Sequence, residues 1–281
     1  MTEIESARSA LVEPDISDWD DAYANRAHVR DAQAYIDGWP EAAAAFRARP
    51  EREGHMRLDI PYGAHERQRL DLFLPEAAPR GLLVFVHGGY WMFFHRDFWS
   101  HLAAGALAHG FAVAMPSYRI CPDARVSGIV QDVAAAVTKA SELVAGPLHL
   151  AGHSAGGHLV TRLVSRPSPL PQDVLARIVR VTSISGVHDL GPLRRTAMNE
   201  TLRIDAAEAA AESPVKLRPV DGIGTAFWVG AQERPEFLRQ TAMMGEAWGA
   251  PMTVEPERHH FDIVDGLSDP EHGLVRTVLA L

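Results

Sequence analysis

Hydrophobic and polar positions change their pattern along the chain, and the first pattern is helical. The alanine-rich stretch EAAAAFRARP is typical of a helix that ends at Pro50, so residues 17–50 predict a helical N-terminal arm. The stretches HMRLDIPYG and RQRLDLFLP then alternate apolar and polar residues, which is typical of antiparallel strands with one solvated face. The turn GAHE between them predicts a hairpin.

Continuous apolar runs follow the hairpin. GLLVFVHGG, FAVAMPSYR and GPLHLAGHS contain such runs, and RVTSISGV and GTAFWVG are weaker examples. A continuous run is expected of a strand that is buried on both faces. The stretches between them, such as FWSHLAAGALAHG and SGIVQDVAAAVTKASELV, have helical spacing. The sequence therefore predicts one α/β domain over residues 1–281, with a mostly parallel central sheet, an antiparallel N-terminal hairpin and helices on both faces.

Composition narrows the classes of function. The formal charge is −9, which argues against nucleic acid as the main partner because phosphate binding needs a basic surface. The single cysteine, Cys121, excludes an intramolecular disulfide and is expected to be a small buried residue. The N-terminal stretch MTEIESARSALVEPD lacks the apolar region of a signal peptide, and no apolar run reaches the length of about 20 residues that spans a bilayer. We therefore expect a cytoplasmic protein without a membrane partner.

The stretch GHSAGGH places one serine, Ser154, between glycines two positions to either side. The apolar stretch LHLAG precedes it, and AGGHLVTRLVS follows with helical spacing. Strand, G-x-S-x-G and helix in this order predict a sharp turn that holds the serine hydroxyl in a strained, accessible position. We expect Ser154 to be a nucleophile.

A nucleophilic serine needs hydrogen-bond donors for the oxyanion that its attack creates. HGGYW follows the first buried strand, and its two glycines leave backbone N–H groups unobstructed. We assign the oxyanion hole to the N–H groups of Gly88, Gly89 and Ala155. We expect His87, which precedes this loop, to have a structural role.

The serine also needs a base, which should come late in the chain and after the acid. The stretch RHHFDIVDG offers His260, our choice, with His259 as the alternative and His272 as a more distant one. No metal or organic cofactor is needed for this chemistry. HExxH is absent, and His153 and His158 are five residues apart, which is a poor spacing for two ligands on one helix.

The acid should follow the strand GTAFWVG. Glu233 is the first carboxylate after it and is our choice, and Glu236 is the alternative. Either could instead be a first-turn glutamate that stabilises the helix FLRQTAMMGEAW. Asp262 is too close in sequence to His260 to be a comfortable orienting partner.

Six stretches carry a family resemblance: HGGYW, SYRICPD, GHSAGGHL, SGVHDLGPLRRT with AMNETLRID, VGAQERPEFLRQ and HHFDIV. In these the chain resembles α/β-hydrolases, and more narrowly esterases of the kynurenine formamidase (arylformamidase) type. The resemblance covers most of the chain and implies a triad of Ser154, Glu233 and His260. The family usually has aspartate at the acid position. Glutamate can also orient the imidazole, but the departure keeps Glu236 open as the alternative.

The implied reaction is hydrolysis of an ester or N-formyl amide through an acyl-enzyme, on a small aromatic or short-acyl substrate. From the aromatic stretch YWMFFHRDFW we expect Tyr90, Trp91 and Phe93 to line the substrate pocket and the other aromatic residues to pack in the core. The alternative function is a catalytically silent hydrolase fold used for binding. A nucleotide-binding protein is disfavoured, because no G-x-G-x-x-G or GxxxxGK[ST] loop follows a strand.

Two segments could cover the pocket. Residues 191–220 fall between two strands and predict a small helical cap, whose Arg194 and Arg195 are expected to face solvent rather than substrate. The N-terminal arm is a second candidate cover. The expected partner is a small molecule, and a homodimer remains open.

Overall fold

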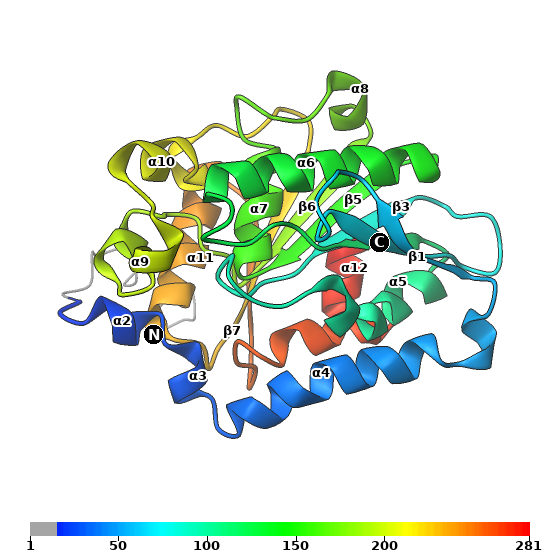
Figure 1. The fold of residues 1–281 in the computed structure, drawn as a ribbon, viewed down its shortest axis with the longest axis horizontal. Coiled ribbons are helices and arrows are strands. Elements are labelled where there is room, and N and C mark those ends of the chain that lie inside the picture. The colour runs from blue at the N-terminus through cyan, green and yellow to red at the C-terminus, as the bar shows by residue number, and fades with distance from the viewer. Residues whose placement is uncertain (1–15) are drawn as a thin grey trace.

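A computed structural model describes residues 16–281, and the expectation drawn from the N-terminal stretch before them lies outside the described residues. The centre of the fold is an eight-stranded sheet with the strand order β1-β2-β4-β3-β5-β6-β7-β8 (Figure 1). Its strands are β1 (Met56–Pro61), β2 (Arg69–Phe73), β3 (Leu82–Val86), β4 (Ala112–Pro116), β5 (Leu148–His153), β6 (Ile178–Ile184), β7 (Gly224–Gly230) and β8 (Met252–Glu255).

The pairing of the strands confirms the predicted sheet. β1 and β2 form the antiparallel hairpin, and β2 pairs antiparallel with β4, whereas all the remaining neighbours are parallel. The edge strand β8 is the one that the sequence analysis did not predict. It has only four residues, none of them fully buried, so its hydrophobic pattern is weak.

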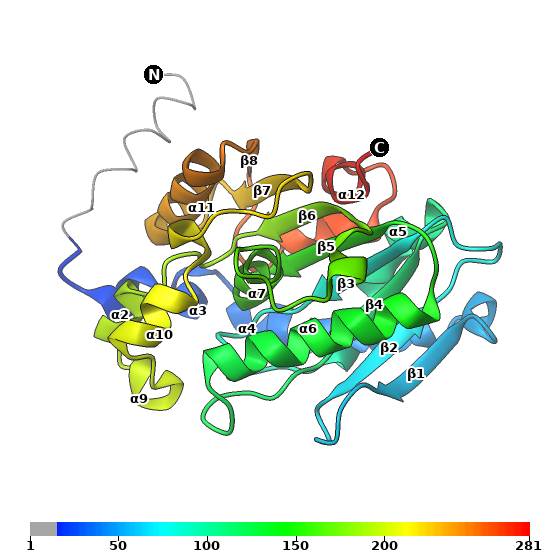
Figure 2. The same ribbon diagram turned by 90° about the horizontal axis from the view of Figure 1, so that it is seen from above.

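Helices cover both faces of the sheet (Figures 1 and 2). They are α2 (Trp19–Ala22), α3 (Asn25–His28), α4 (Ala32–Arg47), α5 (Ala104–Ala108), α6 (Val126–Leu143), α7 (Ala155–Leu163), α8 (Gln172–Leu175), α9 (Asn199–Leu202), α10 (Ala206–Ala211), α11 (Pro235–Trp248) and α12 (Gly273–Leu279). α6 and α7 pack on one face, and α5 and α12 pack on the other.

The continuous apolar run of β3 explains why both faces need covering. Leu82, Val84 and Val86 belong to the hydrophobic core under α6 and α7, while Leu83 and Phe85 belong to the core on the opposite face. Successive side chains of a strand point to opposite faces, so a strand with helices on both sides must be apolar at every position.

The N-terminal arm is helical, as predicted, and consists of three helices. α2 and α3 are single turns, and α4 is the long helix that runs along one side of the molecule (Figure 1). α4 ends at Arg47, three residues before the expected stop at Pro50, and Pro40 lies inside it. Trp39 and Phe46 of α4 pack in the core on the side of α5 and α12, which attaches the arm to the domain.

The segment 191–220 folds into short helices, as expected, and contains α9 and α10 with the 3-10 turns Pro192–Arg195 and Pro214–Lys216. Glu208 of α10 binds Arg125, at the start of α6, with an N–O distance of 2.7 Å. Arg195 lies over the ring of Trp19 in α2. The segment therefore packs beside α2 and the N-terminal end of α6.

No helix within residues 16–281 is long and apolar enough to cross a membrane.

Candidate active site

Ser154 lies at the turn between β5 and α7, with φ 56° and ψ −118°. Backbone in this region is strained for a residue with a side chain, and it persists only where packing holds it. The flanking glycines allow that packing. A Cβ on Gly156 would lie 1.9 Å from the carbonyl oxygen of Val86, and one on Gly152 would lie 2.1 Å from that of Gly156. The turn is thus the strand-to-helix elbow that the sequence predicted.

Sheet order brings the HGGYW loop to this elbow. β3 and β5 are parallel neighbours with Val86 opposite Gly152, so the loop after β3 and the turn after β5 emerge together at the carboxyl edge of the sheet. A Cβ on Gly88 would lie 2.9 Å from Cβ of Ser154. Ala155 opens α7, and its N–H has no acceptor within that helix. Of the predicted oxyanion donors, Gly88 and Ala155 therefore lie directly beside the serine, and Gly89 lines the same cavity.

His260 and Glu233 are in direct contact. Nδ1 of His260 lies 2.6 Å from Oε2 of Glu233, and both side chains are almost completely buried. The backbone N–H of Gly230 donates to Oε1 of Glu233 at 3.0 Å, and the hydroxyl of Ser185 donates to the same oxygen. These donors leave Oε2 for the imidazole, so the carboxylate holds the ring by Nδ1 and leaves Nε2 for another partner.

Ser185 is the part of this arrangement that the sequence analysis missed. It follows β6 directly and has φ 51°, in the left-handed region. The carboxyl ends of neighbouring parallel strands meet at one edge of a sheet. The position of Ser185 at the end of the predicted strand RVTSISGV could therefore have indicated that it lies near the acid.

The alternative acid, Glu236, has other partners. It receives hydrogen bonds from Arg239 at 2.7 Å and from the hydroxyl of Tyr23 at 2.8 Å. Gln240 also donates to it, at 2.9 Å. Glu236 thus binds the N-terminal arm to α11 and does not contact His260.

The alternative bases also have other partners. Nδ1 of His259 lies 3.1 Å from Oδ1 of Asp262, and Nε2 of His272 lies 3.1 Å from Oε1 of Glu255. Among these three histidines, His260 is the one that contacts Glu233.

Ser154 and His260 line the same cavity, which has a volume of about 420 Å³. Gly88, Gly89 and His153 also line it. The remaining walls are mainly aromatic, from Trp39, Tyr90, Phe93, Phe94, Phe98, Trp99 and Phe261. The cavity is therefore suited to a flat apolar group next to the serine.

The prediction that Tyr90, Trp91 and Phe93 line the pocket is wrong for Trp91. Tyr90 and Phe93 line the cavity, but Trp91 does not; its side chain is fully buried and packs edge-on against His158 at a centroid distance of 5.1 Å. Trp91 has φ 56°, and this backbone conformation directs it into the core. Phe94, Phe98 and Trp99, which were expected in the core, line the cavity as well as packing in or against that core.

The two segments that were expected to cover the pocket differ in whether they line the cavity. Within the described chain, no residue of 191–220 lines it. The wall comes instead from the N-terminal arm, through Asn25, Arg26, Gln33, Ile36 and Trp39. The arm was the second candidate cover in the sequence analysis.

Comparison with known proteins places the chain in a family. The BD-FAE family model matches residues 70–167. The kynurenine formamidase of Danio rerio is 30% identical over 240 residues, which cover 80% of this chain and 81% of that protein. The chain belongs to the kynurenine formamidase family.

Solved structures agree with the fold. A candidate thioesterase from Silicibacter sp. TM1040 is 48% identical, with a TM-score of 0.91 over 93% of this chain and 99% of that one. Esterase B of Lactobacillus rhamnosis has a TM-score of 0.66 at 18% identity, over 92% of this chain and 96% of that one. The protein is a hydrolase with the α/β-hydrolase fold.

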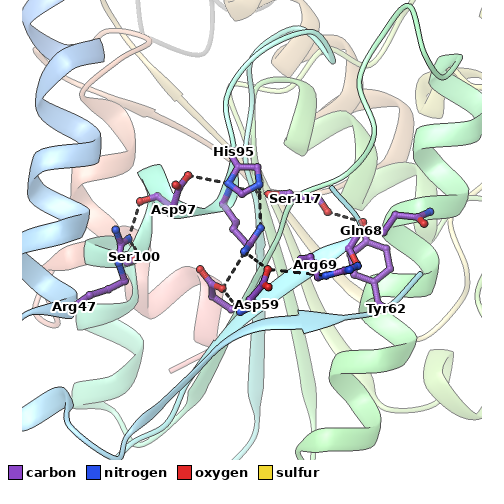
Figure 3. Close-up of polar contacts among 11 residues, drawn as sticks. Arg47, Asp59, Tyr62, Gln68, Arg69, His95, Asp97, Ser100 and Ser117 are labelled. Carbon is purple, nitrogen blue, oxygen red and sulfur yellow. Dashed lines mark hydrogen bonds and ion pairs between the residues drawn. The ribbon is translucent and has the colours of Figure 1, made fainter. Parts of the chain in front are cut away.

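In this family member, a polar network holds the aromatic loop (residues 90–99) against the arm and the hairpin. The guanidinium of Arg96 donates to Asp71 at 2.9 Å and to Asp59 at 2.6 Å. Arg47 of α4 donates to the carbonyl oxygen of Asp97 at 2.8 Å (Figure 3). Because these contacts join the loop to β1, β2 and α4, the arm and the loop form one wall of the cavity.

Buried histidines surround the elbow without being bases. His87 has the structural role that was expected: Nδ1–H donates to the carbonyl oxygen of Gly88 at 2.7 Å, and its ring stacks on Tyr118. Burial lowers the pKa of His87 to about 3, that of His158 to about 4 and that of His188 to about 3. Cys121 is buried as predicted, and burial raises the pKa of its thiol to about 12.

These histidines predict loss of stability in mild acid. An unfolded histidine has a pKa of about 6.5, so below that pH the unfolded state binds protons that the folded state does not. The free energy of unfolding should therefore fall as the pH drops from 6.5, by about 2 kcal/mol per buried histidine at pH 5. Urea unfolding at pH 7.5 and 5.0 would measure it, and a His188→Gln variant should show a shallower pH dependence. Equal stability of the wild-type protein at both pH values would contradict the prediction.

The described residues contain no group of three or more histidine, cysteine, aspartate or glutamate side chains arranged to hold a metal ion.

Proposed function

We propose that this hydrolase cleaves an N-formyl amide of a small aromatic amine, through Ser154, Glu233 and His260. The observation that carries the proposal is the shared cavity: the serine elbow and the Glu233–His260 pair open into a space whose walls are aromatic. The kynurenine formamidases among its relatives support the formamide as the scissile group.

The proposed reaction assigns one role to each of these residues. His260 takes the proton of the Ser154 hydroxyl as its oxygen attacks the formyl carbon, and the N–H groups of Gly88, Gly89 and Ala155 stabilise the oxyanion. His260 then protonates the leaving amine, and the C–N bond breaks. Water, deprotonated by His260, attacks the formyl-enzyme and releases formate. Glu233 holds the imidazole through Nδ1 during both steps.

A comparison of substrates tests the proposal. We expect kcat/KM for N-formylkynurenine to exceed that for p-nitrophenyl acetate and butyrate by several orders of magnitude, with the Ser154→Ala protein as background. Serine-dependent cleavage of the esters with little formamidase activity would instead identify a carboxylesterase. A short-acyl thioester belongs in the same panel.

A fluorophosphonate probe tests the binding-only alternative. Such probes label a serine that a base activates, so we expect stoichiometric labelling of the wild-type protein and none of Ser154→Ala. An unlabelled wild-type protein would favour a silent hydrolase fold.

A further inference from the structure

One side chain in the cavity wall does not fit a purely apolar substrate. Of the lining residues that the structure describes, Arg26 is the one with a permanent charge. It comes from α3 of the N-terminal arm and is exposed at the cavity. The walls near the serine are aromatic, and this cation therefore distinguishes one part of the cavity from the rest.

The arm holds Arg26 in place through its neighbour. Asn25 is 3% exposed, and its side-chain amide donates to the hydroxyl of Tyr90 at 3.1 Å. Tyr90 in turn donates to the backbone oxygen of Tyr23. These bonds attach α3 to the HGGYW loop, which bears the proposed oxyanion donors. The position of Arg26 is thus tied to the catalytic end of the cavity.

The charge of Arg26 has no carboxylate partner among the residues that the structure describes. Its guanidinium donates to the neutral amide oxygen of Gln33. The amide nitrogen of Gln33 donates to Asp37 at 2.6 Å, so the amide separates the cation from that carboxylate. By contrast, Arg30 of the same arm lies 3.5 Å from Asp31, and Arg234 is paired with Asp21.

We infer that Arg26 binds a carboxylate of the substrate, an inference that rests on the proposed function. In the proposed substrate the formamide would reach Ser154, the ring would lie among the aromatic residues and the carboxylate would bind the guanidinium. Arginine suits this role because its planar fork matches a carboxylate, and the bond to Gln33 leaves further N–H donors for it. The aspartates and glutamates that give the chain its net charge of −9 would otherwise disfavour an anion.

A matched pair of substrates tests the inference. The pair is N-formylkynurenine and the analogue whose carboxylate is replaced by a carboxamide, with the same ring and formamide. The measured quantity is the ratio of their kcat/KM values. Arg26→Gln should lower this ratio by about 10- to 100-fold, mainly through KM, because a charge-assisted hydrogen bond is lost. Arg26→Lys should lower it less, because the charge remains and the fork is lost.

The control is Arg30→Gln on the same arm, because the Arg30 side chain is 96% exposed and does not line the cavity. This variant should leave the ratio unchanged. The preference for the carboxylate should also weaken with added salt, because Arg26 is exposed. A ratio that is the same in the wild-type and Arg26→Gln proteins would overturn the inference.

Binding to Ser154→Ala separates this inference from the proposed function. Calorimetric titration of that variant with both compounds measures the same preference without turnover. The carboxylate compound should bind Ser154→Ala more tightly than the carboxamide compound, and adding Arg26→Gln to that variant should remove the difference. Arg26 then has the inferred role even if the wild-type protein hydrolyses only esters. N-formylkynurenine could be hydrolysed while Arg26→Gln changes neither the ratio of the two kcat/KM values nor the ratio of the two affinities. In that case the proposed function stands and the inference fails.

Discussion

Replacing Ser154 by alanine is expected to lower kcat by about 10⁵- to 10⁶-fold for every substrate that the protein turns over. The hydroxyl is the proposed nucleophile, and no other group at the elbow can form the acyl-enzyme. The remaining rate would come from the oxyanion donors and from binding. Steady-state kinetics on a formamide and on an ester measure the loss, and circular dichroism checks that the elbow variant is folded.

Ser165→Ala is the matched control for this experiment. Ser165 is also fully buried but lies beyond the C-terminal end of α7, and its hydroxyl donates to the carbonyl oxygen of Thr161 at 2.9 Å. Its loss should reduce stability by about 1 kcal/mol and leave kcat unchanged. If a clean preparation of Ser154→Ala kept wild-type hydrolysis, the assignment of the nucleophile would be wrong.

The second large effect is expected at Glu233. Glu233→Gln keeps the shape of the side chain but removes the charge that stabilises the imidazolium, and it can present an amide N–H to Nδ1, which favours the wrong tautomer of His260. We expect kcat to fall by about 10⁴-fold. The pH-rate profile and kcat of the purified variant measure the effect.

Glu236→Gln is the matched control, since it is the same substitution three residues away. It leaves the buried Arg239 without its charged partner, so we expect a loss of about 3 kcal/mol in the free energy of unfolding. The kcat of the protein that remains folded should stay within a few-fold of wild type. The reverse pattern, with activity lost in Glu236→Gln and kept in Glu233→Gln, would reverse the assignment of the acid.

The sequence by itself determined the architecture. The alternation in β1 and β2, the continuous runs of β3 to β5 and the helical spacing of α6 and α7 are local patterns. In β3 to β5 and in the two helices the pattern records which faces are buried. The hairpin departs from its predicted solvated face, because Asp71 of β2 is buried and Leu58 of β1 is exposed. GHSAGGH predicted the elbow because its signal is also local. The glycines lie within two residues of Ser154, and backbone packs too closely against this turn to leave room for a Cβ.

Only the tertiary structure decided which glutamate contacts His260. Glu233 and Glu236 lie three and six residues after the end of β7, so sequence position left both open as the acid. Their separation depends on Ser185, at the end of β6, and on Tyr23, which is 213 residues from Glu236 and binds it. Sequence spacing carries no information about such distant partners.

The cavity was decided in the same way. Positive φ at Tyr90, Trp91 and Phe94 turns neighbouring aromatic side chains in different directions, so Trp91 enters the core and Phe94 faces the cavity. The stretch YWMFFHRDFW has the same aromatic pattern whichever of these side chains faces the cavity, so the pattern does not predict the lining. The other wall comes from an N-terminal arm that folds against the loop and brings Arg26 to the site. Its placement depends on contacts between distant segments, such as Asn25 with Tyr90, because a short helix such as α3 is stable only when it packs against the rest of the fold.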